Sequence, residues 1–143
     1  MSIWHEEPDL HALARRGEGT MVAHLGIRYV DAGPDWLTAA MAVDARARQP
    51  YGILHGGASV ALAETVGSAA GNLCVNPERS VCVGLEINAN HVRTVRAGEI
   101  RATARPLHLG GRTQVWDIRI VDGRDRLVCV SRLTLAVIAK RDG

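Results

Sequence analysis

Apolar and polar residues alternate along much of the chain, a pattern typical of β-strands that bury one face. Residues 25–29 and 37–43 alternate in this way on either side of the turn sequence Gly33-Pro34-Asp35, which predicts an antiparallel strand pair. Asp122-Gly123 offers a hairpin turn near the C-terminus. Four more strands are predicted around residues 81–89, 99–105, 114–120 and 133–137.

One of these strands is irregular. Apolar residues occupy odd positions from Val81 through Leu85 to Ala89, so we expect them to share one face. The pattern then moves to an even position with Val92. A shift of one residue is typical of a β-bulge, which often redirects side chains beside a functional site. A strand that simply ends there would give the same pattern, and both interpretations stay open.

Two segments lack this alternation and predict helices. Pro8 and Gly17 bracket a short helix of about two turns. The segment from Gly56 to about Leu73 contains no proline and is rich in alanine, with apolar residues nearly all round, so we expect it to be buried on most sides. One long buried helix and five or six antiparallel strands predict an α+β domain in which a curled sheet wraps around the helix.

The composition narrows the class of protein. A length of 143 residues fits one domain, residues 1–143, and a net charge of +2 with 3% aromatic residues argues against a nucleic-acid partner. The three cysteines show no CxxC spacing and the histidines no metal-ligand spacing, so we expect reduced thiols and no metal site. Neither a signal peptide nor a membrane span is recognisable. We therefore expect a cytoplasmic protein.

Glu64 is the only formally charged residue between His55 and Asn76. A carboxylate in a buried helix is either paired with an arginine from elsewhere in the fold or retained because a reaction needs it. Ser68 lies one turn further along and is within reach to orient the carboxylate. Thr65 is adjacent in sequence but is expected to point elsewhere. Glu64 is thus a candidate catalytic acid or base.

Two glycines open the same helix, directly after His55. Glycine lets another molecule approach the backbone, and free N–H groups at a helix N-terminus suit a developing oxyanion. Gly56 and Glu64 are eight residues apart, or roughly 12 Å along a helix, too far for both to contact one carbonyl group. Two antiparallel copies of the helix would bring Gly56 of one beside Glu64 of the other. If the two residues cooperate, the active unit is at least a homodimer.

Positive charge is concentrated in residues 91–112, which contain five arginines and one acid, a local charge of +4. Arginine suits phosphate oxygens, and Gly110-Gly111 beside Arg112 could admit a phosphate close to the backbone. Solvated strand faces would give the same composition. The sequence contains no dinucleotide-binding or P-loop motif, and its HGG is not accompanied by the GxSxG of α/β-hydrolases.

Three stretches resemble the hotdog-fold acyl-CoA thioesterases, in the branch of the dihydroxynaphthoyl-CoA thioesterases and the proofreading thioesterases of enterobactin synthesis. They are residues 49–65, which begin QPYGILHGGAS, residues 84–93, GLEINANHVR, and residues 106–112, PLHLGGR. The resemblance implies a hotdog fold and hydrolysis of an aromatic acyl-CoA to free acid and coenzyme A. Acyl-carrier-protein thioesters are further candidate substrates. It also implies a homotetramer built as a dimer of dimers, and no cofactor, since coenzyme A is part of the substrate.

The resemblance also assigns roles to residues. It implies that Glu64 is the nucleophile or general base and that the N–H of Gly56 polarises the thioester carbonyl. The residues implied to position the thioester or to assist Glu64 are Gln49, His55 and Ser68. Those implied to lie along coenzyme A are Gly84, His91, Val92, Arg93, Thr94, His108, Leu109, Gly110, Gly111, Arg112 and Thr113. Thr65 and Gly111 depart from the serines expected there, which bears on acyl preference and phosphate contacts.

Two other functions stay open. A hotdog dehydratase or hydratase would use a histidine with an acid on a β-hydroxyacyl thioester, roles that His55 and Glu64 could take. A non-catalytic acyl-CoA-binding module would use the same fold without chemistry, although a binder would gain from an apolar residue at position 64. The coincidence of Gln49 and Gly56 with Glu64 favours hydrolysis.

Overall fold

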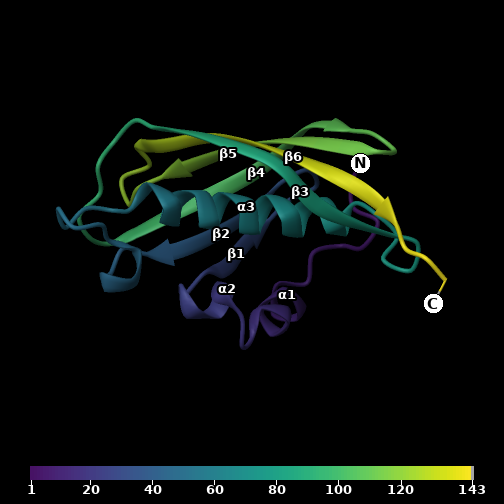
Figure 1. The fold of residues 1–143 in the computed structure, drawn as a ribbon, viewed down its shortest axis with the longest axis horizontal. Coiled ribbons are helices and arrows are strands. Elements are labelled where there is room, and N and C mark those ends of the chain that lie inside the picture. The colour runs from purple at the N-terminus through teal and green to yellow at the C-terminus, as the bar shows by residue number, and fades with distance from the viewer. Residues whose placement is uncertain (143) are drawn as a thin grey trace.

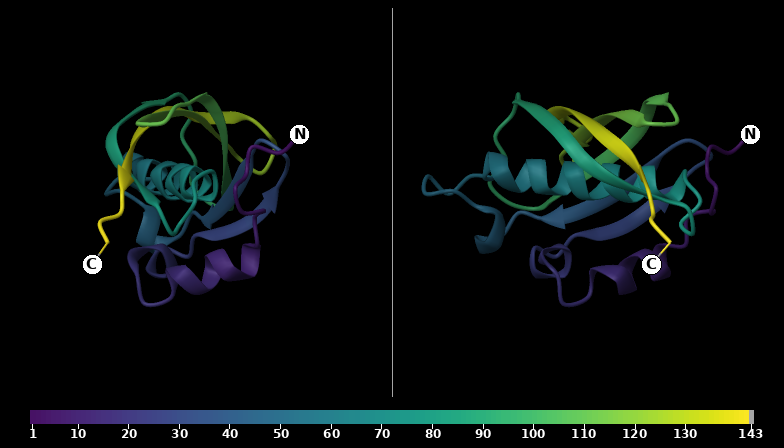
Figure 2. Two further views of the ribbon diagram at one scale, coloured as in Figure 1. Left: turned by 90° about the vertical axis from the view of Figure 1, so that its right-hand side faces the viewer. Right: turned by 45° about the vertical axis from the view of Figure 1, so that its right-hand side comes forward.

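The computed structural model describes residues 1–142, which form one six-stranded antiparallel sheet around a long helix (Figure 1). The elements in chain order are α1 (Leu10–Gly17), α2 (Met21–His24), β1 (Arg28–Ala32), β2 (Leu37–Ala42), the short 3₁₀ helix η1 (Ala45–Ala47), α3 (Gly56–Leu73), β3 (Ser80–His91), β4 (Glu99–Leu109), β5 (Thr113–Val121) and β6 (Leu127–Ala139). The strand order is β1-β2-β4-β5-β6-β3. The sheet curls around α3 (Figure 2), which confirms the predicted α+β fold and the bounds of the long helix.

The two faces of α3 are buried to different degrees. The face toward the sheet carries Leu62 and Val66, both fully buried. Gly67 lies on this face, where a Cβ would come within 2.6 Å of Leu133 Cδ2. The opposite face, which includes Glu64 and Ser68, is only half-buried. The apolar residues all round the helix predicted burial on most sides. In the structure, only the side toward the sheet is fully buried.

The N-terminal segment closes the C-terminal end of α3, an arrangement that the alternation pattern does not predict. The buried Trp4 ring stacks on Trp116 with 6.5 Å between ring centroids. The backbone N–H groups of His5 and Glu6 donate to the carbonyl of Leu73 at 2.8 and 3.1 Å. These bonds satisfy a carbonyl that a helix end otherwise leaves without a partner.

A β-bulge in β3 exchanges the faces of that strand. Gly84 pairs with Leu135 and Glu86 pairs with Thr134, so Leu85 is the extra residue. The prediction that the odd positions share one face is therefore wrong. Before the bulge, Cys82 is buried against α3 whereas Val83 is 41% exposed. After it, Ile87 packs against the core.

The irregularity that the sequence predicts near Val92 is the end of the strand. β3 ends at His91, and the N–H groups of Val92 and Arg93 both donate to the carbonyl of Val128, at 2.9 and 3.3 Å. The interpretation as a strand end is thus confirmed. The predicted first strand also begins later than expected, at Arg28, because the chain turns at residues 25–26 after the short helix α2.

The three cysteines are free thiols. Cys82 and Cys129 are buried, and burial raises the pKa of each. Desolvation by burial, together with the neighbouring Cys82, raises the pKa of Cys74 to about 12. All three are consequently weak nucleophiles at neutral pH. Within residues 1–142, no helix combines the length and apolar character needed to cross a membrane.

Asp122 stabilises the hairpin between β5 and β6. Its carboxylate accepts hydrogen bonds from the backbone N–H groups of Arg124 and Arg126 at 2.9 and 3.0 Å and from the Arg126 side chain. Burial alone would raise the pKa of Asp122, but these bonds and the Arg126 charge outweigh it and lower the pKa to about 2. The ionised form is thus the one that the fold favours.

We expect Asp122→Asn to lower the Tm at pH 7, because the ionised acceptor is lost. The folded pKa of Asp122 is below its ordinary value of 3.8, so its stabilising contribution is present above about pH 4 and is lost as the pH falls toward 2. The difference in Tm between wild type and variant should shrink over that range in thermal melts. Asp125→Asn, in the same hairpin, is the control, and an undiminished difference at pH 2.5 would contradict this account.

Candidate active site

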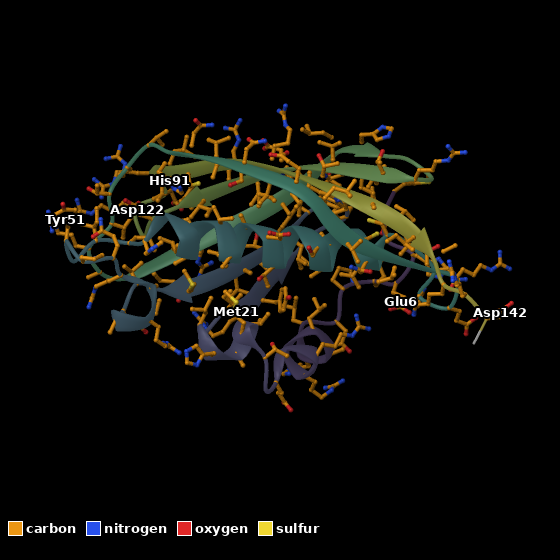
Figure 3. All side chains as sticks on the ribbon, in the orientation of Figure 1. Glu6, Met21, Tyr51, His91, Asp122 and Asp142 are labelled. Atoms are coloured by element: carbon orange, nitrogen blue, oxygen red, sulfur yellow. The ribbon has the colours of Figure 1, made fainter. Side chains whose placement is uncertain are left out.

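The half-buried face of α3 forms one wall of a cavity of about 510 Å³. Glu64, Thr65 and Ser68 lie on this wall, and the facing wall is built from α1, α2 and β1. Figure 3 shows Met21, one of its lining residues, between α2 and α3. We call this the Glu64 cavity. Its volume lies in the range of roughly 300–1,000 Å³ that is usual for small-molecule sites.

The Glu64 carboxylate has no ion pair or hydrogen bond with any residue from 1 to 142. The interpretation of Glu64 as one half of a buried ion pair is therefore wrong. Ser68, which we expected to orient the carboxylate, makes no side-chain hydrogen bond with it in this part of the chain. Thr65 does not point elsewhere but lines the same cavity. In the structure, pairs of buried residues alternate with pairs of half-buried ones along α3, which places residues 64, 65 and 68 on one face.

Gly84 lies directly beside the Glu64 carboxylate. A Cβ at Gly84 would overlap Glu64 Oε1, so the absence of a side chain is what leaves room for the carboxylate in this position. The bulge at Leu85 causes this, because it turns the even positions of the first half of β3 toward α3.

A second cavity, of about 360 Å³, lies at the N-terminus of α3. We call it the Gly56 cavity, and its lining includes Gln49, Gly56, His91, Val92, Arg93 and Thr94. Figure 3 shows His91 at this end of the molecule. His91 packs on the helix start so closely that a Cβ at Gly56 would lie 2.9 Å from His91 Nε2. The structure thus brings together one part of the predicted site here.

The first N–H of α3 is free. The N–H of Gly57 donates to His55 Nδ1 at 2.7 Å, and that of Ala58 donates to the His55 carbonyl at 3.0 Å. The N–H of Gly56 has no partner among the residues that the structure describes. It is a donor at the positive end of the helix dipole, beside a cavity. His55 is exposed and acts as the N-cap, which leaves only its Nε2 for other contacts.

Gln49 belongs to the turn that leads into the helix. Its side-chain Oε1 accepts a hydrogen bond from the N–H of Tyr51, and its carbonyl accepts from Gly52 at 2.9 Å. Gly52 has a φ of +79°, a conformation that favours glycine. These bonds fix the Gln49 amide at the edge of the Gly56 cavity, with its NH₂ group unpaired within residues 1–142.

Most of the residues predicted to lie along coenzyme A are divided between the two ends of the sheet. On β6, Cys129 pairs with His91 and Ala136 pairs with Thr113. The two partners are 136 − 129 = 7 residues apart, which is roughly 23 Å along a strand. Residues 91–94 therefore lie at one end of the sheet and residues 108–113 at the other (Figure 1). One chain does not bring them together.

The five arginines of residues 91–112 fall into two groups, those with an ion pair and those without one among residues 1–142. Arg101 pairs with Glu99 at 3.4 Å, and Arg105 pairs with Asp35 at 3.2 Å. These two exposed pairs fit solvated strand faces. The other three have no ion pair with residues 1–142, and they are Arg93, Arg96 and Arg112.

A curled six-stranded antiparallel sheet around one long helix is the architecture of the hotdog-fold thioesterases. The model of the thioesterase superfamily matches residues 51–129, and the chain belongs to that family.

Curated relatives and solved structures agree with this assignment. The chain is 56% identical over 136 residues to 1,4-dihydroxy-2-naphthoyl-CoA hydrolase of Escherichia coli K12, covering 95% of this chain and 99% of the relative. It is 50% identical to the proofreading thioesterase EntH of Cronobacter sakazakii, covering 95% and 98%. A crystal structure of a mutant of thioesterase PA1618 from Pseudomonas aeruginosa matches with a TM-score of 0.96 and 47% identity, covering 97% of this chain and 100% of that one.

We expect Gly84→Ala to reduce thioesterase kcat by at least about tenfold, because the new methyl group displaces the Glu64 carboxylate and misplacement by about 1 Å can cost about 10²-fold. The Tm should change little, since the atom displaced is the end of a flexible side chain. Gly123→Ala is the matched control, because a Cβ there meets nothing within 4 Å. Steady-state thiol release measures kcat, and a thermal melt measures the Tm. An unchanged kcat would show that Gly84 does not set the carboxylate position.

Proposed function

We propose that this protein hydrolyses acyl-CoA thioesters with aromatic acyl groups and that Glu64 acts as the nucleophile or the general base. The observation that carries the proposal is a carboxylate without any protein partner among residues 1–142, in a cavity whose other walls are largely apolar. The relative that hydrolyses 1,4-dihydroxy-2-naphthoyl-CoA, by its name, supports an aromatic acyl group. Benzoyl-, hydroxybenzoyl- and dihydroxynaphthoyl-CoA are the substrates to test first.

The chemistry needs three contributions. The free N–H of Gly56 donates to the thioester oxygen and stabilises the negative charge that develops on it. Either Glu64 takes a proton from a water molecule that attacks the carbonyl carbon, or Glu64 attacks and water hydrolyses the resulting anhydride. In both routes the C–S bond breaks, coenzyme A leaves as the thiol, and the acyl group leaves as the acid. No cofactor takes part in either route.

We infer that the active unit contains two chains. Gly56 and Glu64 line different cavities of one chain, and residues 91–94 and 108–113 lie at opposite ends of it. A second copy of α3 running antiparallel joins each Gly56 cavity to the partner's Glu64 cavity and both parts of the coenzyme A channel. β3 suits this contact, because it is a long strand at the edge of the sheet with Val83 and Leu85 exposed.

In the same two-chain arrangement, the predicted arginines lie along coenzyme A. Arg93 and Arg112 come from opposite ends of two protomers and meet the phosphates of coenzyme A. A homotetramer, as a dimer of such dimers, repeats the shared sites. Carrier-protein thioesters present the same pantetheine arm, so they are proposed as further substrates. The free thiols and the substrate class favour the cytoplasm.

The two alternative functions are less well supported. A hydratase needs a histidine poised with the acid, but His55 Nδ1 is occupied as the cap of α3. A non-catalytic binder has no use for an unpaired carboxylate beside apolar walls, because desolvating it opposes binding. Hydrolysis uses both the free Gly56 N–H and Glu64.

We expect Glu64→Gln to lower kcat by at least about 10²-fold, because the amide can neither attack nor accept a proton and such assistance is worth roughly 10²–10⁴-fold. The fold should be unaffected, since Glu64 makes no ion pair or hydrogen bond with residues 1–142. Thiol release from benzoyl-CoA and a thermal melt give the two measurements. Glu78→Gln, an exposed carboxylate outside both cavities, is the control. Near-normal turnover by a folded Glu64→Gln protein would overturn the mechanism.

Co-expression tests the shared site. Gly56→Val places a side chain against His91 Nε2 and blocks the donor, whereas Glu64→Ala removes the carboxylate, so each homodimer should be inactive. A hybrid dimer retains one intact site, and random assembly should therefore restore roughly a quarter of wild-type activity. Purification through two different affinity tags isolates the hybrid. A hybrid that forms but releases no thiol would rule out the two-chain site.

A further inference from the structure

The Glu64 cavity has a second polar region, on the wall that faces α3. Tyr29 on β1 and Arg16 on α1 both line the wall that faces α3. Most of the other residues of that wall are apolar, among them Leu13, Val22 and Ile27. A ligand that fills the cavity is therefore bounded on one side by α3, which carries Glu64, and on the other by a largely apolar wall with two hydrogen-bonding side chains.

The Tyr29 hydroxyl is held in its neutral form without a protein partner. Tyr29 is half-buried, and its hydroxyl has no hydrogen bond with residues 1–142. Desolvation by burial raises the pKa of Tyr29, and the Arg16 charge opposes this. A tyrosine hydroxyl in such surroundings normally finds a partner. Tyr29 is among the residues that line the Glu64 cavity, so a ligand there can supply this partner.

Arg16 is exposed at the same wall and belongs to the last turn of α1. Its neighbour Arg15 does not line the cavity, although both side chains are exposed. Arg16 makes no ion pair within residues 1–142, not even with Glu64 in the same cavity. Its donors are thus available to an oxygen atom that enters the cavity.

We propose that Tyr29 and Arg16 bind an oxygen substituent at the end of the acyl group remote from the thioester, and so select oxygen-bearing aromatic acyl groups over unsubstituted ones. The inference rests on the proposed function, because Glu64 fixes which end of the acyl group carries the thioester. Both side chains offer donors, so a ring hydroxyl and a ring carboxylate share the required chemistry. The carboxylate gains more from Arg16, because a bond between two charged groups is stronger.

The experiment compares thiol release from benzoyl-CoA, 4-hydroxybenzoyl-CoA and 4-carboxybenzoyl-CoA by wild type, Tyr29→Phe and Arg16→Met. Tyr29→Phe should lower the ratio of kcat/KM for the hydroxylated substrate to that for benzoyl-CoA by roughly 3- to 10-fold, the loss of one neutral hydrogen bond. Arg16→Met should lower the ratio for the carboxylated substrate by more than the ratio for the hydroxylated one. A merely structural role would change all three substrates alike.

The chain supplies matched controls. Tyr51 is the other of its two tyrosines and is 86% exposed, and Arg15 is the arginine beside Arg16, so Tyr51→Phe and Arg15→Met should leave both ratios unchanged. If Tyr29→Phe fails to fold, Arg16→Met decides the matter, because Arg16 is exposed. Ratios unchanged in folded variants would overturn the inference while leaving the thioesterase intact. No thiol release by wild type from any of the three would overturn the proposed function, and the inference with it.

Discussion

The close approach of α3 to the sheet is the constraint on which the rest of the structure depends. At Gly67 the helix has no side chain, and a Cβ would lie 2.6 Å from Leu133 Cδ2 and 3.0 Å from Ile118 Cδ1. Because the backbone lies so near β5 and β6, the strands can curl around a single helix and bury one of its faces completely. The same packing leaves the opposite face only half-buried, and Glu64 is on that face.

This division of α3 explains why the proposed site needs two chains. The free N–H of Gly56 is fixed at the start of the helix, whereas Glu64 is two turns further along, on a wall that belongs to another cavity. Bending the helix to join them would break its packing on the sheet. In the proposed dimer, a second helix supplies the missing group without any change in either chain. The strand β3, which carries Gly84 beside Glu64, lies at the edge of the sheet, where a partner chain can pack.

The sequence predicts the elements well and the directions of side chains less well. The long helix is recognisable because it lacks proline and alternation, and its bounds agree with the structure. The strands follow from their period of two. The bulge at Leu85 is missed, because apolar residues continue at odd positions of the strand on both sides of it. The Trp4–Trp116 stacking and the wall formed by Arg16 and Tyr29 depend on contacts between distant segments, which no local pattern contains.

The bulge also gives the candidate site its shape. Without the extra residue, one set of alternate positions would face α3 along the whole of β3, and Glu86 would follow Gly84 toward the core. With it, Gly84 faces the Glu64 carboxylate and Ile87 packs against the core, while Glu86 remains exposed. The strand can therefore leave space for a carboxylate at one point and close the core a few residues later. A single inserted residue thus reconciles the space beside the Glu64 carboxylate with an apolar core on the same strand.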